Sequence, residues 1–116
     1  MALFRIAVLL VAVGCGTSAR DQELSESKRA IAKLAVGKLA NEAYPRWSLA
    51  HPDAQCPATI NELVTLVSDR ELQDPWGRPY VMHCGADLPA GAHVIGIRSL
   101  GRDGKANTPD DVTSWE

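Results

Sequence analysis

Residues 21–43, DQELSESKRAIAKLAVGKLANEA, decide the fold of this chain, because they predict one long helix. Acidic residues lie early in this stretch and basic residues later, an order that complements the helix dipole. Pro45 disfavours helical geometry at Tyr44, so we expect the helix to end there. The apolar residues of the stretch fall near one face of the helix, and they are Leu24, Ile31, Leu34, Ala35, Leu39 and Ala43.

The segments that follow the helix predict a small sheet. Thr59 and Glu62 have the spacing of a capping box, which predicts a short second helix. Short apolar and β-branched runs predict strands at 80–84, 92–99 and 112–115. So small a sheet is stable only when a helix covers one of its faces. The fold class is therefore α+β, with a long N-terminal helix packed on a small antiparallel β-sheet.

The first residues read as a targeting signal. Arg5 precedes an apolar run at 6–13, which is too short to span a bilayer as a mature helix. The run ends directly before Cys15 and resembles a bacterial lipoprotein signal, in which that cysteine is lipidated. Cleavage as an ordinary signal near 16–19 is the alternative. We therefore expect a signal peptide at 1–14, a tether at 15–22 and a globular domain at 23–116.

The remaining cysteines are an even pair in an exported chain. Export places Cys56 and Cys84 in an oxidising compartment, where a disulfide between them is expected. Two free thiols or a redox pair are the alternatives. A bridge that closes the loop of residues 56–84 would stabilise the domain by about 3.6 kcal/mol in the chain-entropy model.

Charge and histidine placement exclude several functions. The net charge of −2 gives no reason to expect nucleic acid as a partner. The three histidines, His51, His83 and His93, show no metal-ligand spacing. Ser99 lies near His93 but has no nucleophile-elbow motif around it. The sequence therefore predicts that the protein is not an enzyme.

The C-terminal loop collects carboxylates. Asp103, Asp110 and Asp111 lie close together in a stretch interrupted by Gly101 and Gly104. Crowded carboxylates need compensation, and a hard cation such as calcium takes carboxylate and carbonyl oxygens together. The loop lacks the ligand ladder of an EF-hand. A solvated acidic turn without metal is the alternative.

Four motifs together resemble a known family. They are Thr59-Ile-Asn-Glu-Leu63, Asp74-Pro-Trp-Gly-Arg-Pro-Tyr80, Ser99-Leu-Gly-Arg-Asp-Gly104 and Asp110-Asp-Val112. Over roughly residues 25–116 the chain looks like the globular domain of the major pseudopilin of bacterial type II secretion. The resemblance implies a structural calcium ion in the last loop. The implied ligands are the carbonyl of Leu100, the carboxylate of Asp103, carbonyls near Lys105 and Thr108, and Asp110 or Asp111.

The N-terminal part departs from that family. Its apolar run ends at Cys15, and residues 21–29 are strongly charged where pseudopilins have a long apolar helix. We therefore expect a lipid-anchored envelope protein with a calcium-stabilised pseudopilin-like domain and a structural role linked to type II secretion. Gly16, rather than an aspartate, follows the cysteine, which favours the periplasmic side of the outer membrane. Secretion-system components are the expected partners, and an envelope binding module that reuses the fold without a secretion role is the alternative.

Overall fold

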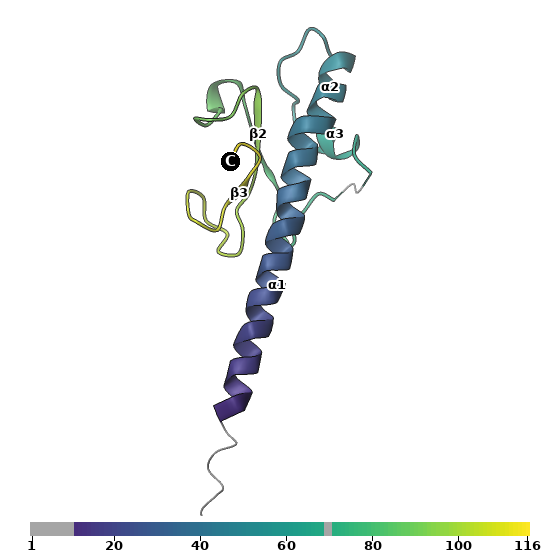
Figure 1. Cartoon of the computed structure of the whole chain (residues 1–116). Coiled ribbons are helices and arrows are strands. Elements are labelled where there is room, and N and C mark those ends of the chain that lie inside the picture. The colour runs from purple at the N-terminus through teal and green to yellow at the C-terminus, as the bar shows by residue number, and fades with distance from the viewer. Residues whose placement is uncertain (1–10, 69–70) are drawn as a thin grey trace, which may run out of the picture.

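The computed structural model describes residues 11–68 and 71–116, with side chains from residue 19 onward. Most of the expected signal peptide, and the side chain of the expected lipidation site Cys15, lie outside these described parts. A long helix runs beside a small sheet and extends well beyond it (Figure 1). The elements in chain order are α1 (Val11–Lys38), the π-helix η2 (Leu39–Ala43), α2 (Tyr44–Ala50), α3 (Asn61–Val64), β1 (Val81–Cys84), the 3-10 helix η3 (Gly85–Asp87), β2 (Ile95–Ser99) and β3 (Val112–Thr113).

The predicted end of the first helix is wrong. Helical backbone continues through Tyr44 and Pro45 to Ala50, because the π-turn η2 rearranges the backbone hydrogen bonds before the proline. The Tyr44 N–H donates to the carbonyl of Leu39, five residues back in the π-helical pattern. Pro45 then occupies the first turn of α2, where the N–H that it lacks is not needed. At its other end α1 begins at Val11, so helical backbone also covers the residues expected to form a tether.

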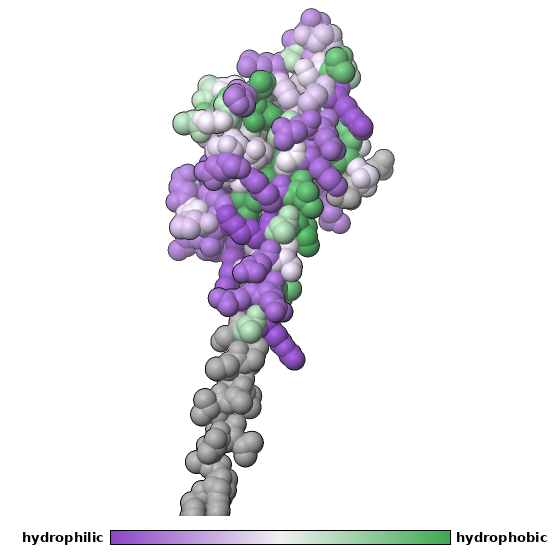
Figure 2. Space-filling model, in the orientation of Figure 1, coloured by the Kyte–Doolittle hydropathy of each residue, from purple (hydrophilic) through white to green (hydrophobic). Residues whose placement is uncertain are grey.

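The buried face of the helix differs from the predicted one. Of the predicted apolar face, Leu39 and Ala43 are buried, whereas three large residues remain more than half exposed. Those three are Leu24, Ile31 and Leu34. The face that meets the sheet is instead rich in alanine, and its buried members are Ala32, Val36, Leu39, Ala40 and Ala43. Small side chains allow the close approach of helix and sheet, and apolar surface is left along the helix (Figure 2).

The sheet has the predicted antiparallel arrangement. Its strand order is β1-β2-β3, and Val81 pairs with Arg98 while Arg98 pairs with Thr113. All five residues of β2 are buried, because β2 is the central strand and lies against the helix. The strands are shorter than predicted, and residues 92–94 lie outside β2, with a bend at 93–94. The predicted α+β fold class is confirmed.

Two local predictions have counterparts in the structure. Glu62 Oε2 accepts hydrogen bonds from the backbone N–H groups of Thr59 and Ala58, which lowers the pKa of Glu62. This is the reach-back half of the predicted capping box. Cys56 and Cys84 form the predicted disulfide, with their Cα atoms 5.9 Å apart. The bridge ties the segment before α3 to the end of β1.

Candidate functional site: the C-terminal loop

Asp74 joins the Asp-Pro-Trp-Gly turn to the beginning of the C-terminal loop. Its carboxylate is buried, and Oδ1 accepts hydrogen bonds from the N–H groups of Trp76 and Arg78 at 3.0 and 2.9 Å. Oδ2 accepts a 2.7 Å bond from the hydroxyl of Ser99, whose oxygen in turn accepts from the N–H of Gly101. Ser99 is therefore a structural residue, held by Asp74 at the start of the loop. The sequence predicts no role for Asp74, although the motifs that contain Asp74 and Ser99 both contribute to the family resemblance.

The same buried carboxylate affects a neighbouring tyrosine. Burial, followed by the negative charges of Asp74 and Glu71, raises the pKa of Tyr80 to about 12. The tyrosine thus stays neutral beside the Asp74 network throughout the physiological pH range.

The two ends of the loop meet in space. Gly101 has a φ of +75°, and a Cβ atom at this position would overlap the backbone carbonyl of Asp110. Only glycine fits such a close contact in the left-handed region. Asn107 also has a positive φ, of 63°, which asparagine tolerates better than most residues. The backbone from Gly101 to Asp110 therefore forms a closed loop after β2.

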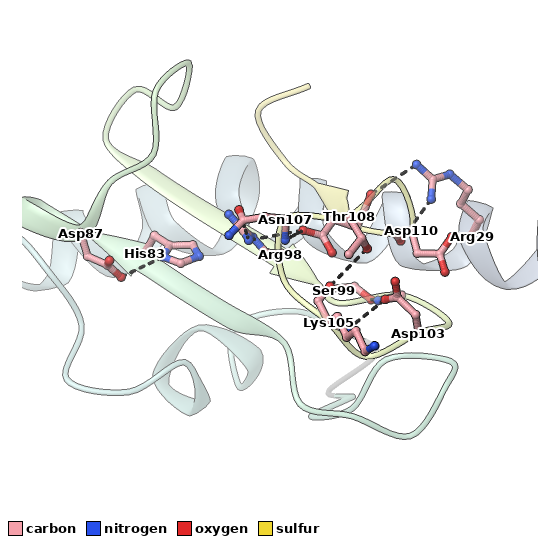
Figure 3. Close-up of polar contacts among 12 residues, drawn as sticks. Arg29, His83, Asp87, Arg98, Ser99, Asp103, Lys105, Asn107, Thr108 and Asp110 are labelled. Atoms are coloured by element: carbon pink, nitrogen blue, oxygen red, sulfur yellow. Dashed lines mark hydrogen bonds and ion pairs between the residues drawn. The ribbon is translucent and has the colours of Figure 1, made fainter.

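Asp103 organises the turn in the middle of the loop. Its Oδ1 accepts a 3.0 Å hydrogen bond from the N–H of Lys105, as Figure 3 shows. This bond, together with one from the side chain of Thr108, holds the pKa of the exposed Asp103 carboxyl below its ordinary value. The carbonyls of Lys105 and Thr108 each accept one internal hydrogen bond, from the Thr108 hydroxyl and the Asp111 N–H. A carbonyl has two lone pairs, so each retains acceptor capacity.

Asp110 and Asp111 have different surroundings. The Asp111 side chain is 9 % exposed, and its Oδ2 lies 3.3 Å from Arg98 Nη1 and accepts a 2.7 Å bond from the Asn107 N–H. Its Oδ1 is buried without a hydrogen-bond partner among the described residues. The Asp110 residue is half-buried, and Leu100 lies half-buried directly after β2. The loop thus brings the predicted site residues into one segment but gives the two aspartates unequal roles.

Basic side chains surround the loop and donate to its oxygens. Arg78 Nη1 donates to the carbonyl of Gly101 at 2.9 Å and to that of Arg102 at 3.5 Å. From α1, Arg29 donates to the carbonyls of Asp110 and Asp111 at 3.2 and 3.3 Å (Figure 3). The sequence analysis missed these contacts, because Arg29 and Arg78 lie far from the loop along the chain.

The histidines have separate local contacts. His83 Nδ1 lies 2.8 Å from Asp87 Oδ2, and the ring of His51 stacks on that of Trp47. Within residues 11–68 and 71–116, no group of three or more His, Cys, Asp or Glu side chains could hold a metal ion. In the same part of the chain, no helix is long and apolar enough to cross a membrane. A cation in the loop would therefore depend on backbone carbonyls as well as carboxylates.

The helix packed on a three-stranded antiparallel sheet, closed by this loop, defines a pseudopilin-like α+β domain. Residues 20–115 match the model of the family described as type II secretion system (T2SS), protein G, and the chain belongs to that family. A curated relative, type II secretion system core protein G of Aeromonas hydrophila, is 46% identical over 43 residues, which cover 37% of this chain and 27% of the relative. The match thus spans about a quarter of that relative's length. No solved structure matches the chain.

Family membership confirms two of the sequence expectations. The family is structural and non-enzymatic, which agrees with the prediction that the chain is not an enzyme. It also implies a location in the cell envelope.

Proposed function

We propose that this chain serves type II protein secretion as a lipid-anchored envelope protein whose pseudopilin-like domain binds calcium in its C-terminal loop. Family membership supports the link to secretion and to secretion-system partners. The lipid anchor at Cys15 and the placement on the periplasmic side of the outer membrane rest on the sequence of the first residues.

One observation carries the calcium proposal. Asp111 Oδ1 is a buried acceptor without a described hydrogen-bond partner, in a loop whose backbone closes on itself. A buried carboxylate oxygen without a partner is costly, and a hard cation is a suitable partner for it. The remaining oxygens would come from the same loop. They are the carboxylate of Asp103 and the carbonyls of Leu100, Lys105 and Thr108, with Asp110 as the alternative to Asp111.

The calcium ion would stabilise the domain and would take part in no reaction. Its charge would compensate the crowded carboxylates, which Arg98 of β2 compensates only in part, through its ion pair with Asp111. Bound to the folded state alone, it would raise the free energy of unfolding by mass action. At 10 mM calcium and a dissociation constant of about 0.1–1 mM, that gain would be about 1.4–2.7 kcal/mol.

Thermal melting with calcium and with EDTA tests this proposal. We expect calcium to raise the melting temperature by at least about 5 °C, and Asp103→Ala to abolish the increase. Asp53→Ala, which removes an exposed aspartate outside the loop, is the matched control and should keep it. Asp110→Asn and Asp111→Asn separate the two remaining carboxylates. Identical melting curves of the unmodified protein in calcium and EDTA would contradict the calcium site.

The anchor and the partners need separate experiments. Mass spectrometry of the mature N-terminus should find acyl chains on Cys15, and Cys15→Ser should release the protein from the envelope. A mature N-terminus elsewhere, without acyl chains, would contradict the anchor. Crosslinking in envelopes should recover secretion-system components. Failure to recover them would favour the alternative binding module, which the charged residues 21–29 also suggest.

A further inference from the structure

Two basic residues of α1 contact the end of the chain. Arg29 and Lys33 are four residues apart, so their side chains lie on the same face of the helix. Arg29 donates to the carbonyls of Asp110 and Asp111, more than 80 residues away in sequence. Lys33 Nζ donates to the carbonyl of Thr113 at 2.6 Å and to the backbone oxygen of Glu116 at 2.5 Å. The pair therefore contacts four backbone oxygens of the C-terminal segment.

These contacts fall where the sheet is weakest. β3 has two residues, and Val112 and Thr113 pair with Ser99 and Arg98 of β2. The strand lies at the edge of the sheet, so one side of its backbone has no neighbouring strand. Lys33 supplies a donor to the carbonyl of Thr113, and Arg29 supplies donors to the residues just before the strand. Hydrogen bonds from charged donors are stronger than those between neutral groups.

We propose that Arg29 and Lys33 form a clamp that holds the C-terminal loop and β3 on α1 without a metal ion. Both side chains place a positive charge next to backbone oxygens of the segment. They therefore supply part of the electrostatic stabilisation that a bound cation would supply. The clamp and the proposed calcium ion are then independent fasteners of the same segment. Only this independence rests on the proposed function, since the clamp itself needs no calcium.

Hydrogen–deuterium exchange of residues 112–116, measured on the full chain in EDTA and in calcium, tests the clamp. The amide of Ser114, which donates to the carbonyl of Ile97 at 2.9 Å, reports opening of this segment. We expect the double variant Arg29→Ala/Lys33→Ala to exchange there about tenfold faster or more in EDTA, because charged hydrogen bonds are lost. A similar acceleration should appear in calcium, because the clamp bonds to backbone oxygens that are not among the proposed calcium ligands.

Matched variants separate the clamp from a general loss of charge. Lys28→Ala removes one positive charge at the neighbouring position of α1 and should leave the exchange unchanged. Lys33→Met keeps the aliphatic stem without the charge and should accelerate exchange as Lys33→Ala does. Lys33→Arg keeps a charged donor and should exchange as slowly as the unmodified protein. High salt should narrow the difference between the unmodified protein and the double variant, since exposed charges are screened.

The outcomes distinguish the clamp from the calcium site. Unchanged exchange of the double variant in EDTA would overturn the clamp. An acceleration that appears only in calcium would overturn its independence from metal. If calcium slows exchange in none of the proteins while the double variant is faster in EDTA, the clamp stands and the calcium site fails.

Discussion

At one end of the sheet a covalent bond holds β1, whereas at the other end hydrogen bonds and ion pairs hold β2, β3 and the C-terminal loop. Cys84, which ends β1, forms a disulfide with Cys56. At the opposite end, Ser99 bonds to Asp74 and Arg98 pairs with Asp111. The strongest connection of the first end is this covalent bond, whereas the second end is held by many weaker contacts.

The difference matters for how each end responds to its surroundings. A disulfide depends on redox conditions and is insensitive to salt and to mild changes of pH. Carboxylates, guanidinium groups and carbonyls respond to protons, salt and cations. The end that carries the candidate cation site is therefore the adjustable one. Four changes test this contrast, in decreasing order of their expected effect on stability.

Asp74→Ala should cause the largest loss of stability. It removes the buried carboxylate at the centre of the polar end, by which we mean the end of the sheet held by hydrogen bonds and the Arg98–Asp111 ion pair. Three donors would lose their acceptor, namely the N–H groups of Trp76 and Arg78 and the hydroxyl of Ser99. Unsatisfied buried donors cost about 1–3 kcal/mol each, so we expect about 3–5 kcal/mol less stability in urea unfolding. Asp74→Asn keeps an acceptor for both N–H groups and should lose less. A loss below about 1 kcal/mol for alanine would mean that this network is not central.

Replacing both Cys56 and Cys84 by serine should break the covalent end. We expect a loss of about 3.6 kcal/mol, because the unfolded chain regains the entropy of an open loop. Urea unfolding of the double variant measures it, and reduction of the unmodified protein should give a similar loss. The effect of salt on stability should be the same with and without the bridge. A changed salt dependence would show that the two ends are not separate.

Gly101→Ala should open the loop without changing any charge. The added Cβ would overlap the Asp110 carbonyl, and the positive φ is unfavourable for alanine. We expect a loss of about 2–3 kcal/mol in urea unfolding. Gly37→Ala is the control, since its added Cβ meets no described atom within 4 Å beyond its chain neighbours and the nearby backbone of its own helix. In the interior of α1 this control should stabilise the protein by up to about 1 kcal/mol.

Protonation of Asp103 in acid should destabilise the polar end, and we expect this effect on stability to be the smallest of the four. The folded-state pKa of Asp103 is lowered, mainly because the Lys105 N–H bonds to its carboxylate. Its contribution is therefore complete above the ordinary pKa of about 3.9 and is lost as the pH falls through the lower folded value. In EDTA, the melting temperature of the unmodified protein should fall more between about pH 5 and pH 2 than that of Asp103→Asn, which keeps the acceptor without titrating. Parallel curves would remove Asp103 from the acid response.

Local patterns predicted most of the elements but not how they contact one another. The periodicity of residues 21–43 predicted a long helix, and short apolar and β-branched runs predicted the strands. The π-turn was missed because Pro45 is a strong local signal for termination. The buried face was misplaced because large apolar residues were weighted above alanines, although Ala32 and Ala43 are fully buried.

The candidate site was predictable in part. Its acidic residues, glycines and family motifs are contiguous in sequence, so the loop could be located there. The unequal surroundings of Asp110 and Asp111 could not, because Arg98 reaches Asp111 only when β2 and the loop fold together. The contacts of Arg29 and Lys33 go to backbone carbonyls, which every residue has, so they leave no pattern in the sequence.

The sequence by itself determined the α+β class, the cysteine pair and the position of the acidic loop, because these depend on periodicity, residue type and spacing along the chain. Only the tertiary structure decided which face of α1 is buried, that Asp74 holds Ser99, and that basic side chains of α1 hold the end of the chain. These features depend on distances between segments up to 83 residues apart. Such distances are set by packing of the whole domain, which local propensity does not encode.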